Sequence, residues 1–295
     1  MANKSEHLGN LPVSETNQAL IFPSLSGRTG KIQMLIDSHA HLDMKDFDRD
    51  RQQVLDRARQ GGLTHVINIG IDHASALKGL QLSAKHDFIF SSIGYHPHNA
   101  EGADASQLKA LSRLVNEPKV VAWGEIGLDF FRNHAPHDKQ LESFERQLDM
   151  AFHFNLPVII HDREAHEKIL EILKTRGSGS QRGVIHCFSG TYDLAMAFID
   201  LGYYISIPGV VTYKNALSVH EVASRIPLES MLIETDAPFL APAPFRGKRN
   251  EPLFVKYTAE KIAQLRHMDF GDVARQTAEN AINLFRLPRL KMEDS

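Results

Sequence analysis

From residue 34 onward, short apolar runs alternate with segments whose apolar residues recur at helical spacing. A short apolar run bounded by polar residues predicts a buried strand, and apolar residues three or four positions apart predict the inner face of a helix. The predicted strands are Met34–Asp37, Thr64–Ile69, Ile89–Ile93, Val120–Gly124, Val158–Ile160, Gly183–Ile185, Tyr203–Ile207 and Met231–Glu234.

A predicted helix follows each strand. The helices are Asp48–Gln60, Ala74–Lys85, Ser106–Asn116, His137–Phe154, Ala165–Thr175, Tyr192–Leu201, Ala216–Arg225 and a final pair, Leu253–Arg266 and Phe270–Phe285. Eight strand–helix units in 295 residues predict an α/β protein with a single (β/α)8 TIM-like barrel. An open doubly wound sheet shows the same alternation. It would not bring the ends of the first, fourth, fifth, sixth and eighth strands to one point as easily as a closed barrel does.

Those five strands end in residues that bind metals. The potential ligands are His39 and His41 after the first strand, Glu125 after the fourth, His161 after the fifth, His186 after the sixth and Asp236 after the eighth. His39 and His41 are two apart in a strand and therefore project to the same side. Asp236 would join them, because the first and last strands of a closed barrel are neighbours. The remaining ligands would hold a second ion. Imidazole and carboxylate suit Zn or Mn, and Mg is a further candidate.

Composition limits the classes of protein to which the chain can belong. The chain is 42% hydrophobic and 23% charged, with a net charge of -3, so it has no global attraction to nucleic acid. Cys187 is the single cysteine, which excludes a disulfide framework and favours the reducing cytoplasm. No run reaches the roughly 20 apolar residues of a membrane span. We expect a monomer with a flexible N-terminal extension (1–33), a hydrolase barrel (34–288) and a C-terminal tail (289–295).

Six segments resemble those of the TatD family of metal-dependent hydrolases, within the amidohydrolase-like barrels. They are Asp37–Asp43, Gly94–Pro97, Gly124–Asp129, His161–Arg163, His186–Gly190 and Glu234–Pro238. The resemblance covers about Met34 to Leu287. It implies a TIM-like barrel that binds two divalent ions and acts as a deoxyribonuclease, with Glu125 bridging the ions.

Further roles are expected for residues beside the ligands. Asp236 can both bind metal and accept a proton, which makes it the best candidate for a general base; the alternative is that the metal centre needs no side-chain base. Glu234 and Asp37 each precede a ligand by two residues and are expected to orient the ligands. Trp123 precedes Glu125 by two, so it is expected to share the inward face and fill the core.

Contacts to substrate are predicted in the loops after the strands. Arg163 follows His161 by two residues and is expected to point into the same mouth. Arg249 and Asn250 lie in a basic loop after the last strand, where barrels often bind phosphate. The alternative is that these are solvated loop residues. By resemblance, His96 lines the pocket and contacts substrate phosphate or the leaving group; the alternative is a plain loop histidine.

These observations predict a two-metal hydrolase whose partner is DNA. A narrow barrel mouth admits a strand end more readily than an intact duplex, which favours a 3'-5' exonuclease that prefers single strands. The same ligands would also serve an ester or amide hydrolase, such as a D-aminoacyl-tRNA deacylase. A binding protein without catalysis is disfavoured because Glu125 and Asp236 are both present.

Overall fold

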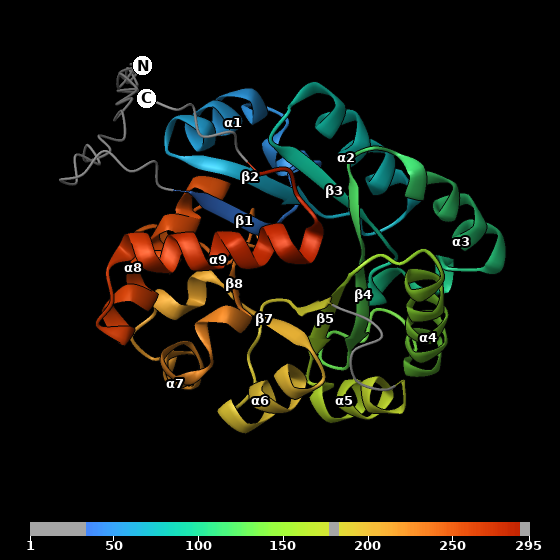
Figure 1. The fold of residues 1–295 in the computed structure, drawn as a ribbon. Coiled ribbons are helices and arrows are strands. Elements are labelled where there is room, and N and C mark those ends of the chain that lie inside the picture. Colours follow the sequence, from blue (N-terminus) through green and yellow to red (C-terminus); the bar gives the residue numbers. More distant parts are fainter. Residues whose placement is uncertain (1–33, 177–182, 290–295) are drawn as a thin grey trace, which may run out of the picture. The chain divides into compact units, whose positions relative to one another are not determined.

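The computed structural model describes residues 34–176 and 183–289. Their backbone forms one parallel sheet of eight strands in the order β1 to β8, the predicted barrel (Figure 1). The strands are β1 (Leu35–Ala40), β2 (Leu63–Asn68), β3 (Ile89–Ile93), β4 (Val120–Asp129), β5 (Val158–Arg163), β6 (Gly183–Ile185), β7 (Tyr203–Ile207) and β8 (Met231–Ile233). The predicted extension, 1–33, and residues 290–295 of the predicted tail lie outside the described residues.

The helices lie close to their predicted positions and surround the strands. They are α1 (Arg51–Gln60), α2 (His73–Lys85), α3 (Ala105–Ser112), α4 (His137–His153), α5 (His166–Thr175), α6 (Tyr192–Asp200), α7 (Leu217–Arg225), α8 (Val255–Arg266) and α9 (Phe270–Phe285). Local sequence explains several helix starts. Helix α2, for example, begins after Asp72, whose side chain accepts the Ser75 N–H at 2.7 Å and so satisfies a free donor of the first turn.

Strand β4 differs from its prediction, because it continues to Asp129 and pairs with β5 from Trp123 to that end. The register shifts between Gly124 and Ile126, so the regular alternation of faces is broken beside Glu125. Trp123 accordingly does not share the face of Glu125. Its Nε1 donates to Oε1 of Gln147 in α4 at 3.2 Å, and the predicted inward position of Trp123 is wrong.

A close approach of β4 to β5 follows that shift. Gly127 has a φ of +144°, and a Cβ at this position would lie 2.0 Å from the carbonyl oxygen of His161. Only glycine fits so near another strand in this conformation. The approach brings the ends of β4 and β5, and the polar side chains they carry, into one place.

The barrel closes between β1 and β8 at the carboxyl ends of these strands. His41 donates its N–H to Ala237 O at 2.7 Å, and Asp236 donates its N–H to His39 O at 2.9 Å. The buried carboxylate of Asp37 also accepts the Thr235 N–H at 2.9 Å and the Thr235 hydroxyl at 2.6 Å. We call these contacts of residues 37–41 with residues 235–237 the β1–β8 seam.

The other end of the barrel is covered by α9. Ala278, Ile282 and Phe285 of this helix belong to one buried cluster with residues from the strands. The strand residues include Ile36, Ile67, Phe90, Val121, Ile159, Val184 and Leu232, with Tyr204 packed against them. Each of the eight strands therefore contributes a side chain to a cluster with a single helix. Because these residues precede the strand ends, α9 covers the amino-terminal end and leaves the carboxyl end for the site.

Candidate metal centre

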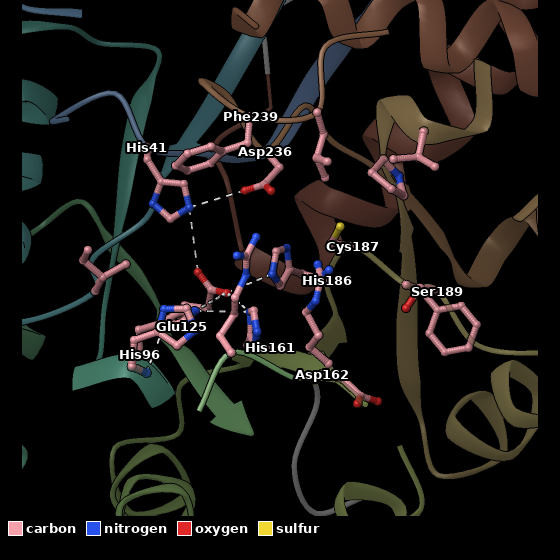
Figure 2. Close-up of a pocket in the computed structure, with 18 of the residues that line it drawn as sticks. His41, His96, Glu125, His161, Asp162, His186, Cys187, Ser189, Asp236 and Phe239 are labelled. Atoms are coloured by element: carbon pink, nitrogen blue, oxygen red, sulfur yellow. Dashed lines mark hydrogen bonds and ion pairs between the residues drawn. The ribbon is translucent and has the colours of Figure 1, made fainter. Parts of the chain in front are cut away.

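A cavity of about 530 Å³ lies at the carboxyl ends of the strands (Figure 2). Five of the six predicted ligands line it: His41, Glu125, His161, His186 and Asp236. The sixth, His39, is fully buried just beneath them. The structure therefore brings the whole predicted ligand set to one place. This is the end of a (β/α)8 barrel at which active sites are found.

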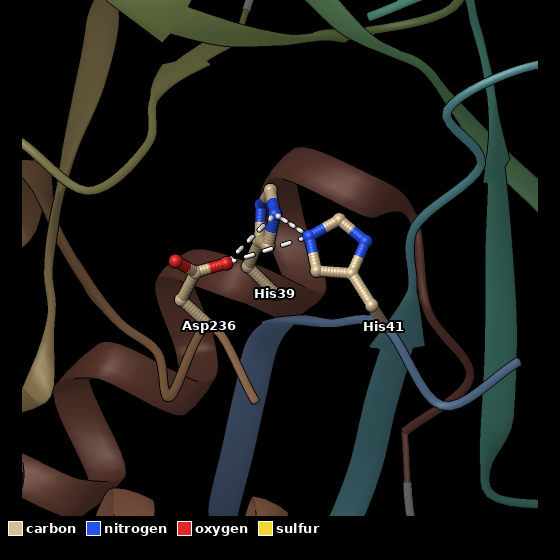
Figure 3. Close-up of side chains that lie close together, drawn as sticks. All are labelled: His39, His41 and Asp236. Atoms are coloured by element: carbon tan, nitrogen blue, oxygen red, sulfur yellow. Dashed lines mark hydrogen bonds and ion pairs between the residues drawn. The ribbon is translucent and has the colours of Figure 1, made fainter. Parts of the chain in front are cut away.

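The first ligand group joins β1 to the loop after β8 (Figure 3). The Nε2 atoms of His39 and His41 lie 3.3 Å apart, and Oδ1 of Asp236 lies 3.7 Å and 3.4 Å from them, respectively. In a tetrahedral zinc site with ordinary bond lengths, two ligand atoms are about 3.4 Å apart. The three side chains thus have the spacing of ligands that share one cation. As expected for residues two apart in a strand, both histidines project together.

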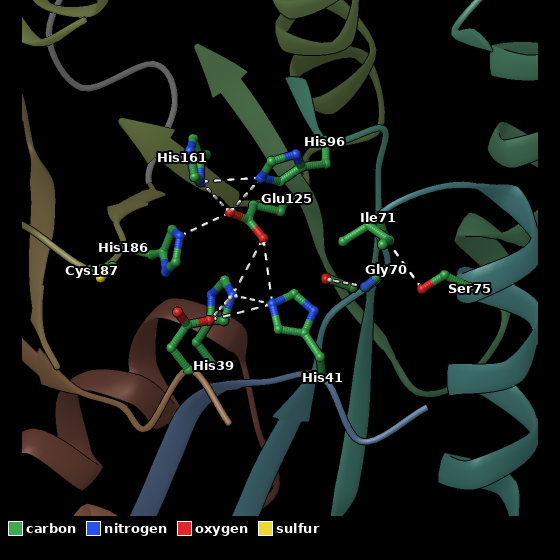
Figure 4. A network of polar contacts seen from close by, with 12 residues as sticks. His39, His41, Gly70, Ile71, Ser75, His96, Glu125, His161, His186 and Cys187 are labelled. Atoms are coloured by element: carbon green, nitrogen blue, oxygen red, sulfur yellow. Dashed lines mark hydrogen bonds and ion pairs between the residues drawn. The ribbon is translucent and has the colours of Figure 1, made fainter. Parts of the chain in front are cut away.

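Glu125 stands between this group and a second one (Figure 4). Its Oε2 lies 3.4 Å from Nε2 of His39. Its other oxygen, Oε1, lies 2.7 Å from Nδ1 of His161 and 2.8 Å from Nε2 of His186. One carboxylate therefore presents a separate oxygen to each side, as a ligand shared by two cations must.

The second group contains His161 and His186, which the sequence placed together on one ion. Both rings contact Oε1 of Glu125. In the structure, the ligand atoms of His186 group with His39 and Glu125, whereas those of His161 group with His96 and Glu125. Burial lowers the pKa of His96 to about 4, so its ring is neutral at pH 7. Its Nδ1 accepts the His98 N–H at 3.0 Å, so the ring proton is on Nε2, which lies 3.5 Å from Oε1 of Glu125. His96 thus lines the cavity as a hydrogen-bond donor, as the resemblance implied.

Charges in the centre favour ion pairs. Burial opposes ionisation of Glu125, but the nearby imidazoles, first His186, outweigh it and hold the pKa of Glu125 well below its ordinary value. Burial likewise opposes protonation of His186, yet Glu125 and Glu234 hold the pKa of His186 well above its ordinary value. A divalent cation would take the place of such a proton, so metal binding and proton release are coupled here.

Two buried carboxylates position the ligands. Glu234 accepts from the Cys187 N–H at 2.7 Å and contacts Nδ1 of His186 at 3.2 Å, which turns Nε2 of His186 toward Glu125. This is the orienting role that the sequence predicted for Glu234. Asp37 contacts the backbone N–H of His39 at 3.3 Å and otherwise binds Thr235, so it acts on the seam.

Some residues around the cavity were not predicted to line it. His98 donates from Nε2 to Oδ2 of Asp129 at 2.7 Å, and the same oxygen lies 3.3 Å from Nε2 of His161. Arg132 and Phe239 also line the cavity. All of them follow strand ends by a few residues, and this position was the only available signal in the sequence.

The two predicted arginines have different environments. Arg163 lines the cavity, as expected. Arg249 does not belong to the lining residues; both of its terminal nitrogens lie 2.7 Å from the carboxylate oxygens of Asp50, and one also donates to Asp46 O at 2.7 Å. Its guanidinium is therefore paired within the protein, and the substrate contact of Arg249 stays a prediction.

Asn250 also has a structural role in place of the predicted substrate contact. It is fully buried (0% exposed) and cannot reach a ligand in the cavity. Its amide donates to Thr235 O at 2.8 Å and to Phe239 O at 2.7 Å. Asn250 thus holds the backbone on both sides of Asp236.

Comparisons with known proteins identify the family of the chain. The family model described as TatD related DNase matches residues 36–286. The chain is 42% identical over 254 residues to the "Uncharacterized metal-dependent hydrolase YabD" of Bacillus subtilis, covering 86% of this chain and 100% of the relative. It is 36% identical over 259 residues to the "3'-5' ssDNA/RNA exonuclease TatD" of Erwinia tasmaniensis, again covering 86% and 100%.

A solved structure shows the same relationship. The crystal structure of YJJV, a TatD homolog from Escherichia coli K12, matches with a TM-score of 0.83 and 32% identity. The match covers 88% of this chain and 100% of that one. With the barrel, the ligand set and these relatives in agreement, the chain belongs to the TatD family and is a metal-dependent hydrolase.

Proposed function

We propose that this hydrolase cleaves phosphodiester bonds of single-stranded DNA from the 3' end and uses two divalent cations. The Erwinia relative, 36% identical over its whole length, is named for activity of this kind on DNA and RNA. The residues proposed to hold the cations are His39, His41, Glu125, His161, His186 and Asp236. Zn, Mn and Mg are the ions to be compared.

The observation that carries the proposal is the position of Glu125. Its two carboxylate oxygens face two ligand groups on opposite sides, His39 on one and His161 with His186 on the other. A pair of divalent cations bound there would supply positive charge for the attacking and leaving oxygens of a phosphodiester and would lower the pKa of a coordinated water.

Asp236 is the residue best placed to move a proton. Its Oδ1 faces His41, and contact with this histidine, against the effect of burial, lowers the pKa of Asp236 below its ordinary value. The carboxylate is therefore ionised at neutral pH and can accept a proton. Its side chain is 13% exposed and lines the cavity, so a bound substrate would reach it. Arg163 and His96 would contact the phosphate or the leaving group from the same cavity.

Location and assembly belong to the same proposal. Across the described ranges, no helix has both the length and the apolar character needed to cross a membrane. A nuclease with one cysteine and no disulfide partner suits the reducing cytoplasm. We propose a cytoplasmic monomer, since the ligand set is complete within one chain.

The proposal is tested with a single-stranded oligodeoxynucleotide labelled at its 5' end. The protein is incubated with Mg, Mn or Zn, or with chelator, alongside Glu125→Ala and the control Glu117→Ala, which removes an exposed carboxylate before β4. We expect a metal-dependent ladder of 5'-labelled products in the wild type and the control. Loss of a shared ligand should slow cleavage by at least about 100-fold, more than loss of an outer-shell partner.

Two other results would contradict the proposal. Cleavage of closed circular single-stranded DNA would exclude action from an end. Failure to cleave DNA with any metal, although cations bind, combined with turnover of a D-aminoacyl-tRNA would assign the centre to ester hydrolysis.

A further inference from the structure

Two exposed phenylalanines lie on loops that also carry residues of the cavity. Phe131, 54% exposed, follows β4, and Phe239, 49% exposed, follows β8. Single exposed apolar side chains are common and carry no meaning alone. Phe152 of α4 is about as exposed. The other two rings differ from it because each lies close to side chains of the site: Phe131 to arginines that line the cavity and Phe239 to the proposed ligand His41.

Two arginine side chains lie close to the ring of Phe131. Cζ of Arg163 lies 4.6 Å from the ring centroid of Phe131, and Cζ of Arg132 lies 5.6 Å from it. Both arginines line the cavity. Within residues 34–176 and 183–289, neither guanidinium forms an ion pair with a carboxylate, in contrast to Arg249 and its partner Asp50. Phe131 therefore lies beside two cations that remain available to an anion.

Asp129 fixes this ring relative to the metal centre. Its Oδ1 accepts the N–H of Phe131 at 3.0 Å and the N–H of Arg132 at 2.7 Å. Its Oδ2 lies 3.3 Å from Nε2 of His161, one of the proposed ligands. A single buried carboxylate thus connects the loop at the mouth with the base of the cavity.

The ring of Phe239 is positioned by two backbone hydrogen bonds. Phe239 donates its N–H to Asp236 O at 2.8 Å, and its own carbonyl accepts from the Asn250 amide at 2.7 Å. The ring lies edge-on to His41 at a centroid distance of 6.1 Å, beside Asp236 in the cavity (Figure 2). Phe239 therefore places an exposed aromatic surface next to the first ligand group.

We propose that Phe131, together with Arg132 and Arg163, and Phe239 are two stacking sites for the bases that flank the cleaved phosphate of a single strand. The inference rests on the proposed function. Bases stack on aromatic rings and on guanidinium planes whatever their sequence, while the guanidinium charge attracts the phosphates. A base inside a duplex has no free face, so these sites would select single strands. They also supply local attraction that a net charge of -3 does not.

The test separates stacking from phosphate contact. Phe131→Ala, Phe239→Ala and the matched control Phe152→Ala are compared on a single-stranded oligonucleotide and on the same strand with abasic residues at the two positions around the 3'-terminal phosphodiester. We expect each mouth variant to raise KM for the normal strand by about 10-fold, the usual scale for losing one stacked base. Its kcat should change little. On the abasic strand, the mouth variants should match the wild type, and Phe131→Trp should restore KM on the normal strand.

The possible failures are distinguishable. If the wild type cleaves the normal strand but KM is unchanged in both mouth variants, the stacking sites are wrong and the proposed function stands. If KM rises equally on normal and abasic strands, the rings support the fold of the mouth and do not bind bases. If the wild type cleaves no single strand, the proposed function and the stacking sites fail together.

Discussion

Asn250 shows how one buried side chain holds the loop after β8 in place. Its amide joins two carbonyls, those of Thr235 and Phe239, and Asp236 lies between them. Its backbone N–H also binds Pro238 O at 3.0 Å. One residue therefore determines where both the Asp236 carboxylate and the Phe239 ring are presented to the cavity.

This position predicts a loss of stability in Asn250→Ala. The buried Thr235 carbonyl would lose its donor, which costs about 1–3 kcal/mol in the free energy of unfolding, and the partly buried Phe239 carbonyl would lose the same donor at a smaller cost. Urea denaturation of the metal-free protein measures this decrease in the free energy of unfolding. Arg249→Ala is the comparison: its ion pair with Asp50 is about a third exposed, so its loss should cost less than about 1 kcal/mol. Equal costs for the two variants would contradict the bracing role of Asn250.

The positions of some residues in the site could be predicted from the sequence, whereas the contacts of others could not. His39, His41 and Asp236 were predictable because strand ends in a closed barrel meet at one point, whatever the loops do. Arg249 and Asn250 were not, because each partner is chosen by tertiary packing. Asp50, which binds Arg249, is 199 residues away in the chain, and nothing local to the basic loop indicates this pairing.

At the level of elements, β4 shows why alternation alone can fail. The pattern around Val120 to Gly124 predicted a strand correctly, and the residues before the shift keep regular pairing with β5. The irregularity between Gly124 and Ile126 then separates the faces of Trp123 and Glu125. A bulge depends on the neighbouring strand as much as on its own residues, so a periodic pattern cannot reveal it.

Strand β2 provides a pH-dependent contact with the segment after α9. His65 is 3% exposed, and its ring binds the backbone of Pro288. Burial lowers the pKa of His65 below 6.5, although the Pro288 contact opposes this. Below pH 6.5 the unfolded chain therefore binds a proton that the folded chain excludes, and stability falls as the pH decreases.

We accordingly expect His65→Gln to reduce this pH dependence. The free energy of unfolding of the wild type should decrease more steeply between about pH 6.5 and pH 5 than that of the variant. Chemical denaturation at several pH values measures both slopes. His220→Gln, on α7, serves as a control because its ring lies in a different contact, with Val211 O. Identical slopes for wild type and His65→Gln would exclude His65 as the source.

At the scale of the whole molecule, metal binding and barrel closure involve the same residues. The β1–β8 seam is made by hydrogen bonds of His41 and Asp236, and their side chains belong to the first ligand group. A cation bound there would link the first and last strands. The site is thus part of the closure of the fold, not an addition to it.

Metal should therefore stabilise the barrel and slow opening of the seam. At a free metal concentration of 100 times Kd, a ligand of the native state adds about 2.7 kcal/mol to the free energy of unfolding. We expect a higher Tm with Mn or Zn than with chelator, and slower amide hydrogen exchange at His41 and Asp236. In His41→Ala this gain should be smaller. If metal raised the Tm without slowing exchange at these amides, the cation would stabilise another part of the barrel.

The seam has a consequence for how the protein is made. A ribosome synthesises His39 and His41 with the first strand, long before it reaches Asp236, and α9 comes later still. A growing chain thus carries some ligands of the centre without the residue that completes the first group. The timing of synthesis therefore delays assembly of the first ligand group until the last strand has met the first.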